Sequence, residues 1–397
     1  MPVAAATSSD GIPLGKGLFY PSVEAVWQNE NNLFLSSEDP IPASSYAVRP
    51  RLIWELPFRE SSLNLAYSPL VREFFGQEVK QGQGLDGPYY SHFVDLGTKL
   101  VFSSEATVEF RGEYVVDTFE TSTFDAGGEV VFNDNQYRKE HVEVEGIRPV
   151  GFRHGIGLSA GYEQLEFDDA STVTSRNYDR AGGGLVYVYK ISPLSRLKLN
   201  AIFEKGTQER PPFAGLPGRE DYGNRLVRLA WQGATGREGQ LEVRVGYLNW
   251  DFAGPSSDFS GLTGDLRYSL RLGARSKLST NLSRAVLPSF YNVNSHYVTS
   301  NIETRLQREK AKSRLTYFVV ASYRQNDYPE ALRDSSGVVI GPRREDRIVR
   351  AEAGVGYRIN DLLQGEVRYR HEKRDSNQDE SEYNAGRVML QLSFGWY

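Results

Sequence analysis

The sequence predicts an all-β protein: a closed, antiparallel transmembrane β-barrel of about 18 strands around a polar interior. Three observations support this prediction, namely the composition, a repeated two-residue alternation and the alternating length of the connections. Hydrophobic residues make up only 39% of the chain, whereas aromatic residues reach 12% and glycine occurs 38 times. No stretch approaches the roughly 18 apolar residues that a membrane helix needs. A barrel strand needs apolar residues on one side only, so this composition suits a barrel.

The alternation is clearest near the end of the chain. Apolar side chains occupy one side of the last segment and mostly polar or small ones the other, as Val388, Leu390, Leu392, Phe394 and Trp396 alternate with Arg387, Met389, Gln391, Ser393 and Gly395. Successive side chains of a strand point to opposite faces, so this pattern predicts strands with one face in an apolar environment.

Such segments repeat along the chain and give the strand count. They begin near residues 18, 46, 62, 91, 106, 137, 155, 179, 195, 223, 238, 260, 276, 297, 313, 346, 362 and 383. An even number is typical of single-chain bacterial barrels. A count of 16 stays open, because the limits of the first and sixth segments are poorly marked. We expect residues 1–17 to form a flexible periplasmic segment and residues 18–397 to form the barrel.

The connections alternate in length. Those after even segments are short, at residues 57–61, 103–105, 192–194, 234–237, 273–275 and 360–361. Those after odd segments are mostly long and polar, at residues 28–45, 76–89, 119–136, 209–221 and 326–345. Short periplasmic turns and long extracellular loops are typical of barrels in the bacterial outer membrane, where we expect this chain. The loops of 18 to 22 residues after segments one, five and fifteen are candidates to fold into the lumen.

Aromatic residues on the apolar faces predict two girdles at the membrane boundaries, where amphipathic rings are favoured. The alternative is that these residues are simply good strand formers. The outer girdle comprises Trp27, Tyr67, Tyr114, Tyr162, Tyr247, Tyr323 and Tyr369. The periplasmic girdle comprises Trp54, Tyr189, Trp231, Tyr357 and Trp396.

Charged residues on the opposite faces predict a lumen with two unlike walls. The acidic wall comprises Glu55, Glu109, Glu113, Glu143, Glu145 and Glu163. The basic wall comprises Arg267, Arg271, Arg305, Arg314, Arg324, Arg350, Arg358, Arg368 and Arg370. One hypothesis is a transverse field that orients charged solutes and favours acidic sugars. The alternative is a lattice of Arg–Glu pairs.

The sequence offers little for an enzyme, so we predict no catalytic residue, no cofactor and no metal site. The histidines have no metal-ligand spacing; they are His92, His141, His154, His296 and His371. A hydrolase on the barrel remains an alternative class. The acidic segments 168–169 and 375–382 could hold Ca²⁺, or they could be solvated loops.

Cysteine is absent, which excludes disulfides, thiolate metal sites and a lipid anchor on cysteine. The net charge of −5 gives no indication of nucleic-acid binding. No secretory signal is visible, although an outer-membrane protein requires one, so we expect a mature form in which Met1 is a cloning start.

Two regions resemble the putative beta-barrel porin 2 family. The first contains residues 20–25, Glu30-Asn31-Asn32 in the first loop and residues 46–52. The second runs from residue 347 to 394 and contains Arg368-Tyr369-Arg370 and Tyr383-Asn384. Where the family has Asp-Asp-Asn in the first turn, this chain has Glu-Asn-Asn. The resemblance implies a barrel that takes part in secreting or assembling a surface polysaccharide, and it transfers no catalytic residue.

Three functions are therefore open: a polysaccharide export channel, a diffusion porin for small solutes, and a closed barrel that anchors an envelope complex. The partners expected are outer-membrane lipid and lipopolysaccharide, and a periplasmic export partner if the first function holds. The barrel-assembly machinery would recognise the C-terminal strand, through Trp396, because Tyr397 lies one residue beyond the alternation.

Overall fold

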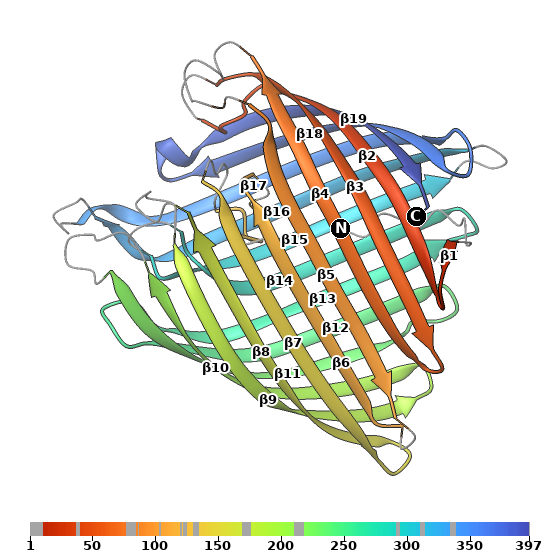
Figure 1. Cartoon of the computed structure of the whole chain (residues 1–397). Coiled ribbons are helices and arrows are strands. Elements are labelled where there is room, and N and C mark those ends of the chain that lie inside the picture. The colour runs from red at the N-terminus through yellow and green to blue at the C-terminus, as the bar shows by residue number, and fades with distance from the viewer. Residues whose placement is uncertain are drawn as a thin grey trace.

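The computed structural model shows one closed β-barrel, and its strands are tilted relative to the barrel axis (Figure 1). The structure describes residues 11–396 except 37–39, 77–84, 86, 103–104, 120, 122–124, 130–134, 169–175, 210–217, 291–293, 310–313 and 334–338. No helix in this described part is long and apolar enough to cross a membrane.

The wall consists of the strands β2 to β19, and β1 lies at its edge. The first ten strands are β1 (Ile12–Leu14), β2 (Gly17–Glu30), β3 (Ala43–Phe58), β4 (Ser61–Phe75), β5 (Tyr89–Val101), β6 (Thr107–Asp117), β7 (Tyr137–Val150), β8 (His154–Phe167), β9 (Asn177–Ser192) and β10 (Ser195–Glu209). The others are β11 (Arg219–Ala234), β12 (Gly239–Phe252), β13 (Phe259–Leu272), β14 (Ser276–Pro288), β15 (His296–Glu309), β16 (Leu315–Arg333), β17 (Val339–Arg358), β18 (Leu363–Ser376) and β19 (Tyr383–Gly395).

Each strand pairs antiparallel with its neighbours in sequence, and β19 closes the ring by pairing with β2. Trp27 faces Leu390 in this closing pair. The prediction of 18 antiparallel strands is confirmed, and the alternative of 16 is wrong. Within the predicted N-terminal segment, the short β1 pairs with the beginning of β2, while residues 1–10 lie outside the described residues.

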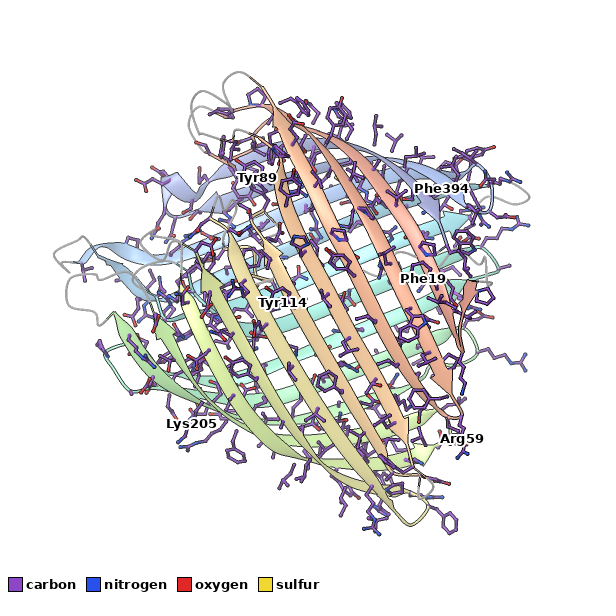
Figure 2. All side chains as sticks on the ribbon, in the orientation of Figure 1. Phe19, Arg59, Tyr89, Tyr114, Lys205 and Phe394 are labelled. Atoms are coloured by element: carbon purple, nitrogen blue, oxygen red, sulfur yellow. The ribbon has the colours of Figure 1, made fainter. Side chains whose placement is uncertain are left out.

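The alternation along the strands separates two faces of the wall, from which side chains project in both directions (Figure 2). Large apolar side chains remain exposed on the outer face, for example Val48 and Leu52 on β3 and Leu158 on β8. Isolated in water, such a continuous apolar belt would be unstable; in lipid it is the expected outer surface of a barrel. On the same two strands, charged residues such as Arg49, Arg51 and Glu163 occupy the alternate positions and face the lumen.

Two prolines interrupt the ladder between β3 and β4. The register places Pro50 opposite Pro69, and the pairing stops at Val48↔Val71 and resumes at Leu52↔Tyr67. Proline has no backbone N–H to donate, so a gap in the ladder is the expected consequence.

The connections differ in length at the two ends, as predicted. Between β3 and β4 only two residues lie outside the strands, whereas residues 118–136 connect β6 to β7. Two of the long loops are shorter than predicted. Residues 31–42 connect β2 to β3, because both strands extend further than their apolar patterns. The segment 326–345 is mainly a β-hairpin, because β16 and β17 continue to pair as far as Arg333↔Val339, with irregular register on the way.

The predicted girdle residues all take outer-face positions in the alternation. The periplasmic members Trp54, Tyr189, Trp231 and Tyr357 lie in the last third of their strands, whereas five of the outer members lie in the middle third: Tyr67, Tyr162, Tyr247, Tyr323 and Tyr369. Their strands continue further than the apolar patterns, as β4 does from Tyr67 to Phe75. The Tyr67 hydroxyl lies 2.9 Å from Nδ1 of His92, near the beginning of β5. Where these rings lie relative to a bilayer stays a prediction.

Candidate functional site

The lumen is crossed by two connections that start from nearly opposite walls. The strands β2 to β9, red to green in Figure 1, form the near wall, and the later strands, cyan to blue, form the far wall. The strands β6 and β15 are nine places apart in either direction around the ring. We call the crossing residues the clasp: residues 125–129 from the β6–β7 connection, with Ser289, Phe290 and residues 294–296 at the β14–β15 connection.

Glu129 joins the two halves of the clasp. Its side chain is fully buried; its carboxyl group is hydrogen bonded to the Ser289 hydroxyl and accepts a hydrogen bond from the Phe290 backbone N–H, both at 2.6 Å. These two hydrogen bonds satisfy both oxygens of a polar group that would otherwise be costly to bury. The β6–β7 segment is thereby fixed to the far side of the barrel.

Further contacts fix the same segment to the strands of the far wall. Asn326 on β16 donates its side-chain N–H to the Gly127 carbonyl oxygen at 3.0 Å. The Tyr297 hydroxyl on β15 donates to Asp125, and Arg374 on β18 donates to the Gly128 carbonyl oxygen. The segment therefore spans from β6 to three strands on the opposite side.

The turn in this segment requires glycine. Gly128 adopts φ 67°, a conformation that L side chains rarely take. A Cβ atom on Gly127 would lie 1.9 Å from the Tyr297 hydroxyl oxygen and 2.5 Å from its ring. Only glycine lets the backbone approach this buried tyrosine so closely.

Phe290 crosses the lumen in the opposite direction, from the β14–β15 connection to the near wall. Its side chain is 1% exposed and packs into a cluster on the near wall that contains Val115, Tyr137, Leu165, Phe167 and Tyr178. These residues lie on β6 to β9, so an apolar anchor from the β14–β15 connection is buried among the strands that face it. Burial of one phenylalanine side chain contributes about 1.5–3 kcal/mol.

A buried charge cluster supports the clasp from the far wall. Asp346 is completely buried and lies 2.7 Å from the Arg344 guanidinium and 3.9 Å from that of Arg374. Ser376 donates a further hydrogen bond to Asp346 at 2.8 Å. Tyr328 lies under Arg344, with the guanidinium carbon 4.9 Å from the ring centroid.

Other connections at this end extend the closure. Arg176, before β9, is 1% exposed and donates to the Asn294 carbonyl oxygen at 2.8 Å and to Gln208 at 3.1 Å. The Ser257 backbone N–H donates to Glu330 at 3.2 Å. The long connections thus meet over the lumen rather than leaving it uniformly wide.

The predicted acidic wall lies on β3, β6, β7 and β8, at lumen-facing positions. Most of its members have a cation from the same or a nearby strand. The pairs are Glu109 with Lys99 and Arg111, Glu113 with Lys139, Glu145 with Lys198, and Glu163 with Arg180. Glu55 and Glu143 take the same face of β3 and β7. Local pairing on this wall weakens the predicted transverse field.

The predicted basic wall lies on β13 and β15 to β18. Lumen-facing positions are occupied by Arg267, Arg271, Arg305, Arg324, Arg350, Arg358, Arg368 and Arg370. Arg314 is placed wrongly by the prediction: it precedes β16 in a turn and donates to the Ile359 carbonyl oxygen, because β16 begins only at Leu315.

The arginines of the basic wall differ in their partners. Arg350 pairs with Glu303, and Arg370 with Glu352 at 2.8 Å. Among the described residues, Arg305 and Arg324 have no carboxylate partner, and the same holds for Arg271 and Arg358 at the ends of β13 and β17. The Arg305 guanidinium lies 4.1 Å from the centroid of the Phe318 ring, a cation–π contact that leaves its charge uncompensated.

The sequence prediction missed the residues of the clasp and of the cluster beneath it. It identified the connection after segment five as one that could fold inward, but it could not name Asp125 or Glu129. Arg344 fell in the segment 326–345 that was expected to be a loop, and Asp346 at the very beginning of the next predicted strand. The available signal was the pair Gly127-Gly128 between acidic residues in a long connection.

The histidines are not gathered into a metal site. No group of three or more His, Asp or Glu residues that could hold a metal ion occurs in the described ranges, which include residues 375–382 but not Asp169. His141 instead lies 3.1 Å from Glu163 as part of the acidic wall.

Comparison with known proteins agrees with this architecture. The chain is similar in fold to the outer-membrane protein OpdK of Pseudomonas aeruginosa, with 11% identity, coverage of 95% of this chain and 99% of that one, and a TM-score of 0.52. It is also similar to OccK2 (OpdF) of the same organism, solved in complex with glucuronate, with 14% identity, 96% and 98% coverage and a TM-score of 0.50. A third similar structure is OccAB3 of Acinetobacter baumannii, with 9% identity, coverage of 96% of this chain and 99% of that one, and a TM-score of 0.50. No curated protein sequence matches the chain.

The fold, the apolar belt and these similarities define an integral β-barrel protein of the bacterial outer membrane. Residues 235–395 match the family described as putative beta-barrel porin 2. The match confirms the resemblance found in residues 347–394, whereas residues 20–52 lie outside the matched region.

Proposed function

We propose that this barrel is a channel for small polar solutes, with a preference for anions. The observation that carries the proposal is a closed 18-strand ring with a charged lumen whose outer mouth is narrowed by the clasp. A polar lumen in an apolar membrane offers a path for hydrated solutes, and the clasp limits their size. Catalysis is not part of this proposal.

The preference for anions follows from Arg305 and Arg324. Both face the lumen on the far wall without a carboxylate partner in the described part of the chain, whereas the acidic residues opposite are mostly paired. Uncompensated positive charge raises the local concentration of anions. The P. aeruginosa barrel OccK2, of the same fold, has been solved in complex with glucuronate, which is a small anion.

Export of a polysaccharide, which the family resemblance implied, is not the function that we propose. The clasp joins opposite sides of the lumen by a buried carboxyl group and a buried phenylalanine. A polymer passing through the barrel would have to displace both, whereas a small solute could pass beside them.

Ion selectivity tests the proposal. We expect the double variant Arg305→Gln, Arg324→Gln to reduce the preference for chloride over potassium. Each charge removed at about 10 Å in water is worth about 0.4 kcal/mol, or roughly twofold per residue. The reversal potential across a planar bilayer under a KCl gradient measures this ratio.

Arg275→Gln provides the matched control, because Arg275 is exposed in the short β13–β14 turn and should leave the selectivity unchanged. A wild-type channel that prefers cations, or equal selectivity of the wild type and the double variant, would contradict the preference for anions.

A further inference from the structure

We propose that the clasp is a proton-controlled latch: protonated Glu129 holds the outer mouth narrow, and loss of that proton releases residues 125–129. This inference rests on the proposed channel function and adds a gating step to it. It concerns only described residues, and it follows first from the geometry around the Glu129 carboxyl group.

The two partners of Glu129 suit a protonated carboxyl group as well as a carboxylate. The Phe290 backbone N–H can only donate, so one carboxyl oxygen must accept. The Ser289 hydroxyl can either donate or accept, so the other oxygen can carry a proton and donate it to Ser289. The docked segment can therefore keep both hydrogen bonds without burying a charge.

The surrounding charges do not compensate an ionised Glu129. Asp125 on the same connection is a second acid, and Tyr297 on β15 and Tyr328 on β16 are neutral. Cations face the segment from β16, β17 and β18. They are Arg324 near Gly128, Arg344, and Arg374.

Two of these cations, Arg344 and Arg374, are engaged elsewhere. Arg344 makes three hydrogen bonds to the Asp346 carboxylate, between 2.7 and 3.1 Å. Arg374 donates to the carbonyl oxygens of Gly128 and Glu129 rather than to the Glu129 side chain. Burial, and then the neighbouring charge of Asp125, therefore raise the pKa of Glu129 from 4.5 to about 7.

The direction of the pH effect follows from this raised pKa. Docked Glu129 has a pKa of about 7, whereas a released, solvated carboxyl group returns to 4.5. At a pH between these two pKa values, docking of the segment is therefore accompanied by uptake of a proton on Glu129. The latch is strongest below pH 4.5, weakens as the pH rises towards 7, and changes little above it. Between pH 4.5 and pH 7, the equilibrium constant for docking of the segment falls by at most about 300-fold.

Single-channel recordings of the full chain in planar bilayers test this latch. For the wild type, we expect the high-conductance state to be more populated at about pH 8 than at about pH 5. Glu129→Gln should stay mainly in the low-conductance state at both values, because an amide reproduces the hydrogen bonds of the protonated acid. Glu380→Gln, exposed in the short helix η2 (Asp379–Ser381), is the control and should respond to pH as the wild type does.

A second variant tests the latch without relying on titration. The chain has no cysteine, so Glu129→Cys combined with Ser289→Cys introduces a single pair of thiols at the two groups that are now hydrogen bonded. We expect oxidation to hold the low-conductance state and reduction to restore the high-conductance state, at both pH values. Heat-modifiable migration in gel electrophoresis shows that each variant is folded.

The outcomes separate the latch from the channel. Two results would overturn the latch and leave the channel intact. One is a wild-type conductance that does not depend on pH, and the other is a Glu129→Gln variant with the same pH dependence as the wild type. Absence of conductance in the wild type and in the reduced double-cysteine variant would overturn the proposed function itself.

Discussion

Replacement of Asp346 by alanine is expected to lower the free energy of unfolding by about 3–5 kcal/mol, the usual effect of removing one partner from a buried ion pair. Asp346 is fully buried and lies within 4 Å of both Arg344 and Arg374. Without it, two buried guanidinium groups lose their shared counter-charge. Urea titration in lipid vesicles, followed by tryptophan fluorescence, measures the change.

The neighbouring residue provides the matched control. Glu345 also forms an ion pair, with Arg347 at 2.9 Å, but both side chains are exposed, by 41% and 61%. Solvent screens such a pair, so Glu345→Ala should change stability little. If the two substitutions had equal effects, the cluster beneath the clasp would not contribute to the stability of the barrel as we describe.

Gly127→Val is expected to release the clasp and to hold the channel in its high-conductance state. A Cβ atom at this position would overlap the ring of Tyr297, which is fully buried and stacks on Tyr328 at 5.4 Å between centroids. Overpacking of this kind costs about 1–3 kcal/mol. The ratio of docked to released segment should then fall by roughly 5- to 150-fold. Single-channel conductance at about pH 5, where the wild type should be latched, shows the largest difference.

Gly97→Val is the control for that experiment. Gly97 is also a glycine of the barrel, on β5, and a Cβ atom there would meet no other atom within 4 Å. It should leave the conductance states and their pH response unchanged. A Gly127→Val channel that remains in the wild-type low-conductance state would show that the docked segment does not narrow the mouth.

The wall of the barrel could be predicted from the sequence because its signals are local. Period-two alternation identified all 18 strands, and it placed residues such as Arg350 and Glu163 on the lumen side. Their ion pairs with Glu303 and Arg180 could not be predicted in the same way. These pairs depend on the register between neighbouring strands, which the alternation alone does not specify to the residue.

The clasp could not be predicted because its contacts are not local. Glu129 and Phe290 are 161 residues apart and meet only after the ring has closed. Neither connection has a hydrophobic period that would indicate its position. Arg344 was missed because the β16–β17 hairpin has an irregular register and its strands extend further than their alternation indicates. Asp346 was placed on a strand, but its burial between Arg344 and Arg374 depends on contacts between strands.

Solute uptake by liposomes tests the central claim, that the barrel is a channel for small solutes, most directly. The full chain, reconstituted at about pH 8, where the latch is weakest, should allow glucuronate to enter and cause swelling, while a dextran polymer should remain excluded. Gly127→Val should admit glucuronate at acidic pH as well. Swelling no faster than that of empty liposomes, for both the wild type and Gly127→Val, would contradict the claim.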